Sequence, residues 1–123
     1  KRTTLGKTVP ASLVDVDGNY VGYARGFTNR VGVISIDART GKVRRSSAAE
    51  NVMALEVRRT GTLVWVTEHG TTRSVHARTA ADDVVLGSGE KIDPRSLALA
   101  DSGATTAHVF WVDGREPHVA AVE

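Results

Sequence analysis

The stretch DVDGNYVGYARG, Asp15 to Gly26, decides how the chain is interpreted. Asp15, Asp17 and Asn19 alternate around a glycine, as oxygen ligands do in some calcium-binding loops. The same residues also suit a tight turn between two antiparallel strands. Glycine supplies a positive φ at little cost, and Asp or Asn stabilises such turns. The rest of the chain distinguishes the two interpretations.

Similar segments occur three times, at about 3–42, 43–79 and 83–123. Each has a turn glycine followed by a large aromatic residue, and both recur at a spacing of roughly 40 residues. The glycines are Gly18, Gly61 and Gly103, and the aromatic residues are Tyr23, Trp65 and Trp111. A period of this length with several strands per repeat is typical of β-propeller blades.

The repeats favour a hairpin turn over a calcium-binding loop for the opening stretch. The segments equivalent to the opening stretch are RRTGTL (58–63) and ADSGAT (100–105), which keep the glycine but not the acidic pattern. A calcium loop also usually ends in glutamate at its twelfth position, which here is Gly26. We therefore expect a hairpin turn and no metal site.

Alternation and turn signals predict four strands in each repeat. In the first repeat the expected strands are Thr3–Val9, Ser12–Asp17, Tyr20–Arg25 and Arg30–Asp37. DARTGK (37–42) is then expected to turn into the next repeat. SSAAENVMALEVRR (46–59) also fits a helix, but its apolar residues alternate from Met53 to Val57, which favours a strand. The prediction is one all-β domain, residues 1–123, of three four-stranded antiparallel propeller blades, half of a six-bladed ring.

The opening stretch followed by RVGVISIDARTGKV (30–43) resembles the blades of bacterial TolB-like and WD-repeat-like β-propellers. The resemblance covers about the first 45 residues and weakens afterwards. The Trp-Asp dipeptide of WD repeats is missing, because FWVDG separates Trp111 from Asp113. The resemblance implies an architecture that carries many functions, so it indicates no catalytic residue.

The sequence contains no recognisable catalytic or metal-binding motif. Cysteine is absent, and the four histidines do not have the spacing of metal ligands. A G-x-S-x-G nucleophile elbow and a phosphate-binding loop are also missing. We expect no catalytic residue, no cofactor and no metal. Two carboxylates from different repeats could still converge on a sugar.

The charge and hydrophobicity of the chain indicate whether nucleic acids or membranes are expected partners. Basic and acidic residues number 16 and 14 and are interspersed, which argues against nucleic-acid binding. An apolar run of about 20 residues is absent, so membrane insertion is not expected. The sequence leaves the compartment open. It also leaves open whether the chain is a piece of a longer one.

In an up-and-down sheet, successive turns lie at opposite ends. The first-to-second and third-to-fourth connections of each repeat therefore gather at one end, and they are the longer and more charged loops. Loops on a rigid scaffold commonly carry function. The candidate ligand-binding residues are Arg25, Glu50, His69, Asp93, Asp113 and Arg115. The recurring aromatic residues could stack on sugars, but their matched register favours packing between blades.

These patterns predict a non-catalytic binding or assembly module. The alternative is part of a propeller hydrolase or lyase that acts on carbohydrate. The sequence does not identify the ligand, and a protein and a carbohydrate are the two candidates. If Thr3–Val9 and DVVLGSG (83–89) are outer strands of a preceding unit, the last unit lacks its own outer strand. We then expect self-association, or association with the remaining part of a propeller.

Overall fold

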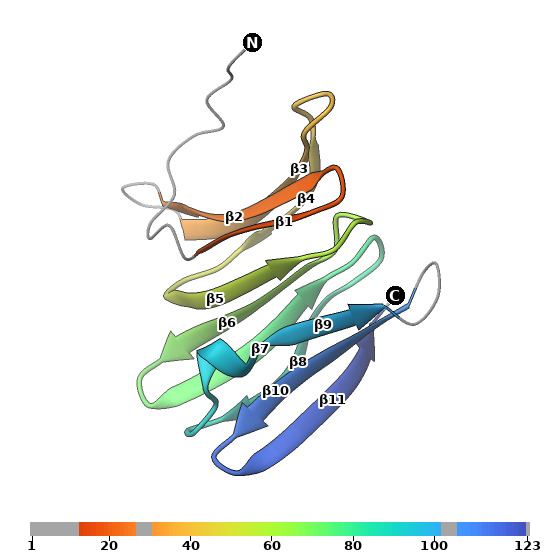
Figure 1. Cartoon of the computed structure of the whole chain (residues 1–123). Helices are drawn as coiled ribbons and strands as arrows, with labels where there is room; N and C mark the ends of the chain where they lie inside the picture. Colours follow the sequence, from red (N-terminus) through yellow and green to blue (C-terminus); the bar gives the residue numbers. More distant parts are fainter. Residues whose placement is uncertain (1–12, 27–30, 102–105, 123) are drawn as a thin grey trace.

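The computed structural model describes residues 13–26, 31–101 and 106–122, which form three antiparallel sheets stacked in chain order (Figure 1). The first sheet has the order β1-β2-β3-β4, the second β5-β6-β7-β8, and the third β9-β10-β11. The all-β prediction is confirmed. The strands are β1 (Val14–Asp17), β2 (Tyr20–Gly26), β3 (Val31–Asp37), β4 (Val43–Ala48), β5 (Val52–Val57), β6 (Leu63–His69), β7 (Thr72–Arg78), β8 (Asp83–Gly89), β9 (Ala98–Asp101), β10 (Ala107–Asp113) and β11 (Glu116–Val122).

Tight turns make these sheets simple meanders. The opening stretch forms the predicted hairpin, in which Asp17 pairs with Tyr20 and Gly18 has a φ of 59°. Gly61 has a φ of 86° in the equivalent turn of the second sheet, and Gly103 lies outside the described residues. A positive φ is costly for residues with a Cβ atom, so glycine recurs at these turns.

The sequence repeats are out of phase with the sheets by one strand. DARTGK was expected to lead into the next unit, but it joins β3 to β4 within the first sheet. This prediction was wrong because the turn is closed by Gly41 N–H, which donates to the Asp37 carbonyl at 2.8 Å. Such a short turn joins only antiparallel neighbours. Likewise β8 completes the second sheet instead of opening the third.

The third sheet has three strands among the described residues, where four were expected. The predicted strand Thr3–Val9 lies outside the described residues. The ambiguous segment 46–59 forms the end of β4 and all of β5, which confirms the strand prediction. The structure describes one complete short helical turn, the 3-10 helix η2 (Pro94–Ser96).

The two recurring tryptophans are buried between sheets, as their register predicted, whereas Tyr23 is buried against residues of its own sheet. Trp65 is 1% exposed and Trp111 5% exposed, each on the second strand of its sheet. Trp65 belongs to a cluster with Val33 of the first sheet. Trp111 packs on β8 of the preceding sheet, where a Cβ atom on Gly87 would lie 2.7 Å from Cζ2 of the indole. Each tryptophan therefore joins its own sheet to the one before it.

Aspartates of the opening stretch also connect the first two sheets. The Val57 N–H donates to Asp15 Oδ2 at 2.9 Å, and the Arg59 N–H donates to Asp17 Oδ2 at 3.0 Å. The acidic pattern that resembles a calcium loop thus supplies hydrogen-bond acceptors to the backbone of the neighbouring sheet.

Candidate functional site

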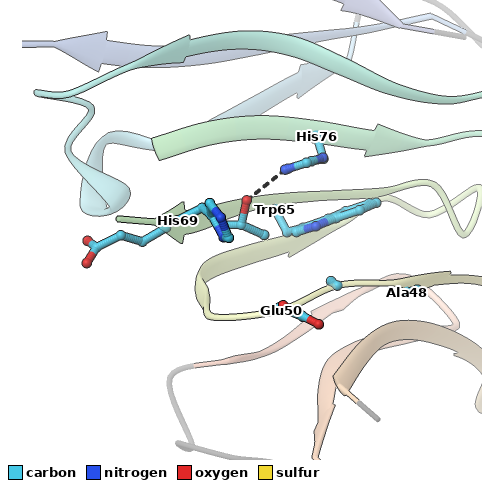
Figure 2. A pocket seen from close by; sticks show the side chains of 8 residues that line it. Ala48, Glu50, Trp65, His69 and His76 are labelled. Carbon is cyan, nitrogen blue, oxygen red and sulfur yellow. Dashed lines mark hydrogen bonds between the residues drawn. The ribbon is translucent and has the colours of Figure 1, made fainter. Parts of the chain in front are cut away.

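The β4–β5, β6–β7, β8–β9 and β10–β11 connections lie at one end of the stacked sheets, on the left in Figure 1, as the alternation of turns predicts. The expectation that these are the longer connections was wrong, because the β6–β7 and β10–β11 connections are two-residue turns, whereas residues 38–42 and 58–62 form longer connections at the opposite end. A pocket of about 270 Å³ opens at the end that carries the β4–β5 connection, between the first and second sheets (Figure 2). It is lined by Ala48, Ala49, Glu50, Trp65, Thr67, Glu68, His69 and His76.

The pocket brings together two of the predicted residues, Glu50 from the β4–β5 connection and His69 from the end of β6. Asn51 makes this possible by adopting a left-handed backbone with a φ of 51°, which asparagine tolerates better than most residues. Its carbonyl accepts the Glu68 N–H at 3.1 Å. This hydrogen bond holds the loop that carries Glu50 beside the end of β6.

An aromatic pair underlies the pocket. Trp65 and His76 are direct partners on β6 and β7, and their rings stack at 5.2 Å with planes 5° apart. Thr67 Oγ1 and His76 Nε2 form a hydrogen bond of 2.8 Å, which is drawn in Figure 2. Burial lowers the pKa of His76, although the nearby charge of Asp83 opposes this shift. His76 is therefore neutral at pH 7 and fixed in orientation.

The charge of Glu68 is compensated. Arg73 Nε donates to Glu68 Oε2 at 2.9 Å, and another guanidinium nitrogen of Arg73 donates to the Ile92 carbonyl at 2.7 Å. The pocket consequently offers an imidazole from His69 and a carboxylate from Glu50, which suit a small polar ligand with donors and acceptors. Across the described part of the chain, no three His, Asp or Glu side chains are placed to share a metal ion.

Two of the predicted residues, Asp93 and Asp113, stabilise loops and do not line the pocket. Asp93 Oδ1 accepts the Arg95 N–H at 3.0 Å and caps η2, and this hydrogen bond together with the Arg95 guanidinium lowers the Asp93 pKa. Asp113 Oδ1 accepts the Lys91 N–H at 3.1 Å. Arg25 on β2 and Arg115 in the β10–β11 turn also lie outside the pocket lining. The ligand-binding role of all six residues stays a prediction.

A second group of titratable residues lies where β1 meets β5. Burial of Glu56, together with its hydrogen bond to Asp15, raises the Glu56 pKa to about 7. Asp15 also accepts the Val57 N–H, so its carboxyl group contacts two residues of β5. The pair was not predicted, because Asp15 was considered as a turn residue or calcium ligand and Glu56 as part of an ordinary strand.

The sequence analysis also missed the Trp–His pairs. Trp111 stacks on His118 at 5.5 Å, which repeats the pairing of Trp65 with His76 one sheet later. A signal was present in the sequence. Each histidine lies almost as far after its hairpin glycine as the tryptophan lies before it, so a hairpin places the two rings side by side.

Comparison of the chain with protein families, with curated proteins and with solved structures gave no match. Among the residues that the structure describes, none belongs to a helix long and apolar enough to span a membrane.

Proposed function

We propose that this chain is a non-catalytic assembly module of the β-propeller type, whose three sheets are part of a ring that further sheets complete. The observation that carries this proposal is a difference in exposure at equivalent positions. The recurring aromatic residues occupy equivalent positions on β2, β6 and β10, and the residue before each of them faces the opposite side of its sheet. These preceding residues and their cross-strand partners are Gly22 and Ser35, Val64 and Ala77, and Phe110 and Val119.

In the first two sheets, these positions are covered by the next sheet. Ser35 is 0% exposed and donates from Oγ to the Gly61 carbonyl. Val64 and Ala77 are 0% exposed and pack in one cluster with the third sheet. In the third sheet, Phe110 is 42% exposed and Val119 58% exposed.

The whole outer face of the third sheet is apolar or weakly polar. It carries Ala98, Ala100, His108, Phe110, Val112, Pro117, Val119 and Ala121. None of these described positions is Asp, Glu, Lys or Arg, although surface strands normally carry such residues. A contiguous exposed apolar patch of this kind marks an interaction surface.

The exposed edge of the third sheet supports the same proposal. β3 and β7 each pair with a fourth strand, whereas no described strand pairs with the outer side of β11. β11 is seven residues long, has no bulge and contains the apolar run Val119–Val122. Proteins usually protect such edges with lysine, bulges or short strands, because an open edge pairs with other chains.

Light scattering across a range of concentrations tests the proposal. The wild-type chain should show a mass above 13.1 kDa that falls on dilution. Phe110→Asp should shift the mass to that of one chain, because a carboxylate cannot be buried against another sheet at low cost. Val85→Asp is the control, since Val85 is 59% exposed on β8 of the second sheet and lies on neither outer face of the stack. A mass of one chain up to about 1 mM, the range of very weak binding, contradicts the proposal.

The pocket supports a binding role within the same module. Glu50 and His69 would contact a small polar ligand, such as a sugar of a carbohydrate or a side chain of a protein. A panel of sugars and short peptides should contain a compound that raises the melting temperature. The rise should be lost in Glu50→Ala and kept in Lys42→Ala, because Lys42 is exposed in the β3–β4 connection and does not line the pocket. If no compound acts through Glu50, the pocket is not the binding site.

The alternative of a carbohydrate hydrolase or lyase receives less support from the geometry. Glu56, beside Asp15, has a raised pKa, which is common at active sites. However, they hydrogen-bond to each other, whereas glycosidase carboxyl groups stand about 5 Å or more apart with the sugar between them. The pair therefore fits a contact between sheets better than a sugar site.

A further inference from the structure

We propose that the partner is a second copy of this chain, which adds its residues 3–9 to the open edge of β11 as a fourth strand. This inference rests on the proposed assembly function. The two copies exchange these strands reciprocally, so one chain supplies both the missing strand and the cover for the apolar face.

The sequence of the opening segment matches that of a fourth strand. DVVLGSG forms β8, the fourth strand of the second sheet. TTLGKT (3–8) aligns with VVLGSG (84–89) through the shared Leu-Gly pair, and each is followed within a few residues by a proline and a first strand. Residues 1–12 lie outside the described part of the chain, so this assignment comes from the alignment with β8.

The way in which the chain connects consecutive sheets explains how one partner can both pair with the edge of β11 and cover the exposed face of the third sheet. β4, the fourth strand of the first sheet, leads through residues 49–51 into β5. β8 leads in the same way through residues 90–97 into β9. In both cases the sheet that follows a fourth strand covers the face of the sheet that the strand completes. A chain that adds its residues 3–9 to β11 therefore carries its own first sheet to the exposed face.

The segment cannot come from the same copy. Residues 10–13 would have to join the added strand to β1, and five residue steps span at most about 18 Å. The second sheet separates the first from the third (Figure 1). Two sheet spacings are already about 20 Å, before any path around the second sheet. Reciprocal exchange between two copies closes the assembly with two-fold symmetry and gives each third sheet a fourth strand.

The alignment also gives a register and a charge pair. On β7 and β8, Ser74 lies opposite Ser88, with a distance of 2.8 Å between their Oγ atoms. Glu116 takes the place of Ser74 when His118 is aligned with His76. Lys7 takes the place of Ser88 when the Leu-Gly pairs are aligned. Opposite charges would thus face each other across the junction between the copies, which favours this register.

Engineered cysteines test the register, because the chain has no cysteine of its own. A Lys7→Cys chain mixed with a Glu116→Cys chain should form a disulfide-linked dimer under mild oxidation, since side chains in contact across strands lie within disulfide reach. The matched control pairs a Lys42→Cys chain with the Glu116→Cys chain and should give little cross-linking. Lys7→Glu should weaken the dimer at least severalfold, and adding Glu116→Lys should restore it.

The outcomes separate this inference from the proposed function. A mass of twice 13.1 kDa with the specific cross-link supports both. A dimer that lacks the cross-link, and that persists when residues 1–9 are deleted, overturns strand exchange and leaves the assembly function intact. A chain that stays single at every concentration overturns both.

Discussion

The second and third sheets follow the same local rules but differ in exposure. Both place a tryptophan on their second strand and stack it on a histidine of the third strand. On the opposite face, however, Val64 of the second sheet is 0% exposed and Phe110 of the third is 42% exposed. The difference lies in the neighbouring sheet and not in the strand itself. Burial at these positions is therefore a property of assembly, which sequence alternation alone cannot report.

The largest expected effect comes from removing a side chain between sheets. Trp65→Ala and Trp111→Ala should each lower the free energy of unfolding by about 3–5 kcal/mol, the usual cost of truncating a core aromatic residue. Phe110→Ala should cost less than about 1 kcal/mol in dilute protein, because the side chain is already exposed. Urea unfolding followed by circular dichroism measures all three.

The Phe110→Ala variant also tests whether the outer face of the third sheet is covered within one chain or between chains. A cost equal to that of Trp111→Ala at every concentration would mean that the outer face of the third sheet is covered within a single chain. A cost that grows with protein concentration would instead place the burial between chains.

The next effect concerns the contact between the two sheets. Gly87→Ala places a Cβ atom about 2.7 Å from the Trp111 indole, a rigid neighbour that cannot move aside. We expect a loss of about 1–3 kcal/mol, as for other overpacked cores. Ser88→Ala on the same strand is the control, because Ser88 is exposed and should change stability by less than about 0.5 kcal/mol. Equal stabilities of the two variants would contradict the close packing of β8 on Trp111.

Much of this fold was accessible from the sequence. Alternation and the recurring glycines predicted the strands and the hairpin of the opening stretch, because both depend on local backbone preferences. The grouping of strands into sheets was not accessible. Whether Val43–Ala48 pairs with β3 or opens the next sheet depends on hydrogen bonds between strands, and the repeat pattern is compatible with both.

The candidate site shows the same limit. Its end of the sheets followed from the alternation of turns, and Glu50 and His69 were selected on that basis. Their meeting in one pocket depends on the bend at Asn51 and on stacking of the sheets, which are tertiary features. Asp93 and Asp113 were selected for the same reason, but their carboxylates cap backbone N–H groups.

A smaller effect, a dependence of stability on pH, is expected at the junction of the first two sheets and not at that of the last two. The Glu56 pKa rises from 4.5 to about 7 on folding. Between these values the folded chain binds more protons than the unfolded chain, so stability falls as pH rises from 4.5 to 7 and then levels off. Because Glu56 is half-buried and screened by solvent, we expect a contribution of about 1 kcal/mol.

Glu56→Gln should remove this loss, because an amide keeps a donor for Asp15 without ionising. Urea unfolding at pH 5 and pH 8 measures the effect as the difference between the variant and the wild type. If that difference is the same at both pH values, Glu56 does not retain its proton in the folded chain.

The smallest expected effect is that of calcium on the opening stretch, for which we expect no change in melting temperature. The Oδ2 atoms of Asp15 and Asp17 already accept the N–H groups of Val57 and Arg59. A calcium ion needs six to eight oxygen ligands, and recruiting these two carboxylates would break both links to the second sheet. The melting temperature with millimolar calcium should therefore equal that with chelator. A chelator-reversible rise would show that the acidic pattern of the first sheet binds metal, a property that its equivalents in the other two sheets lack.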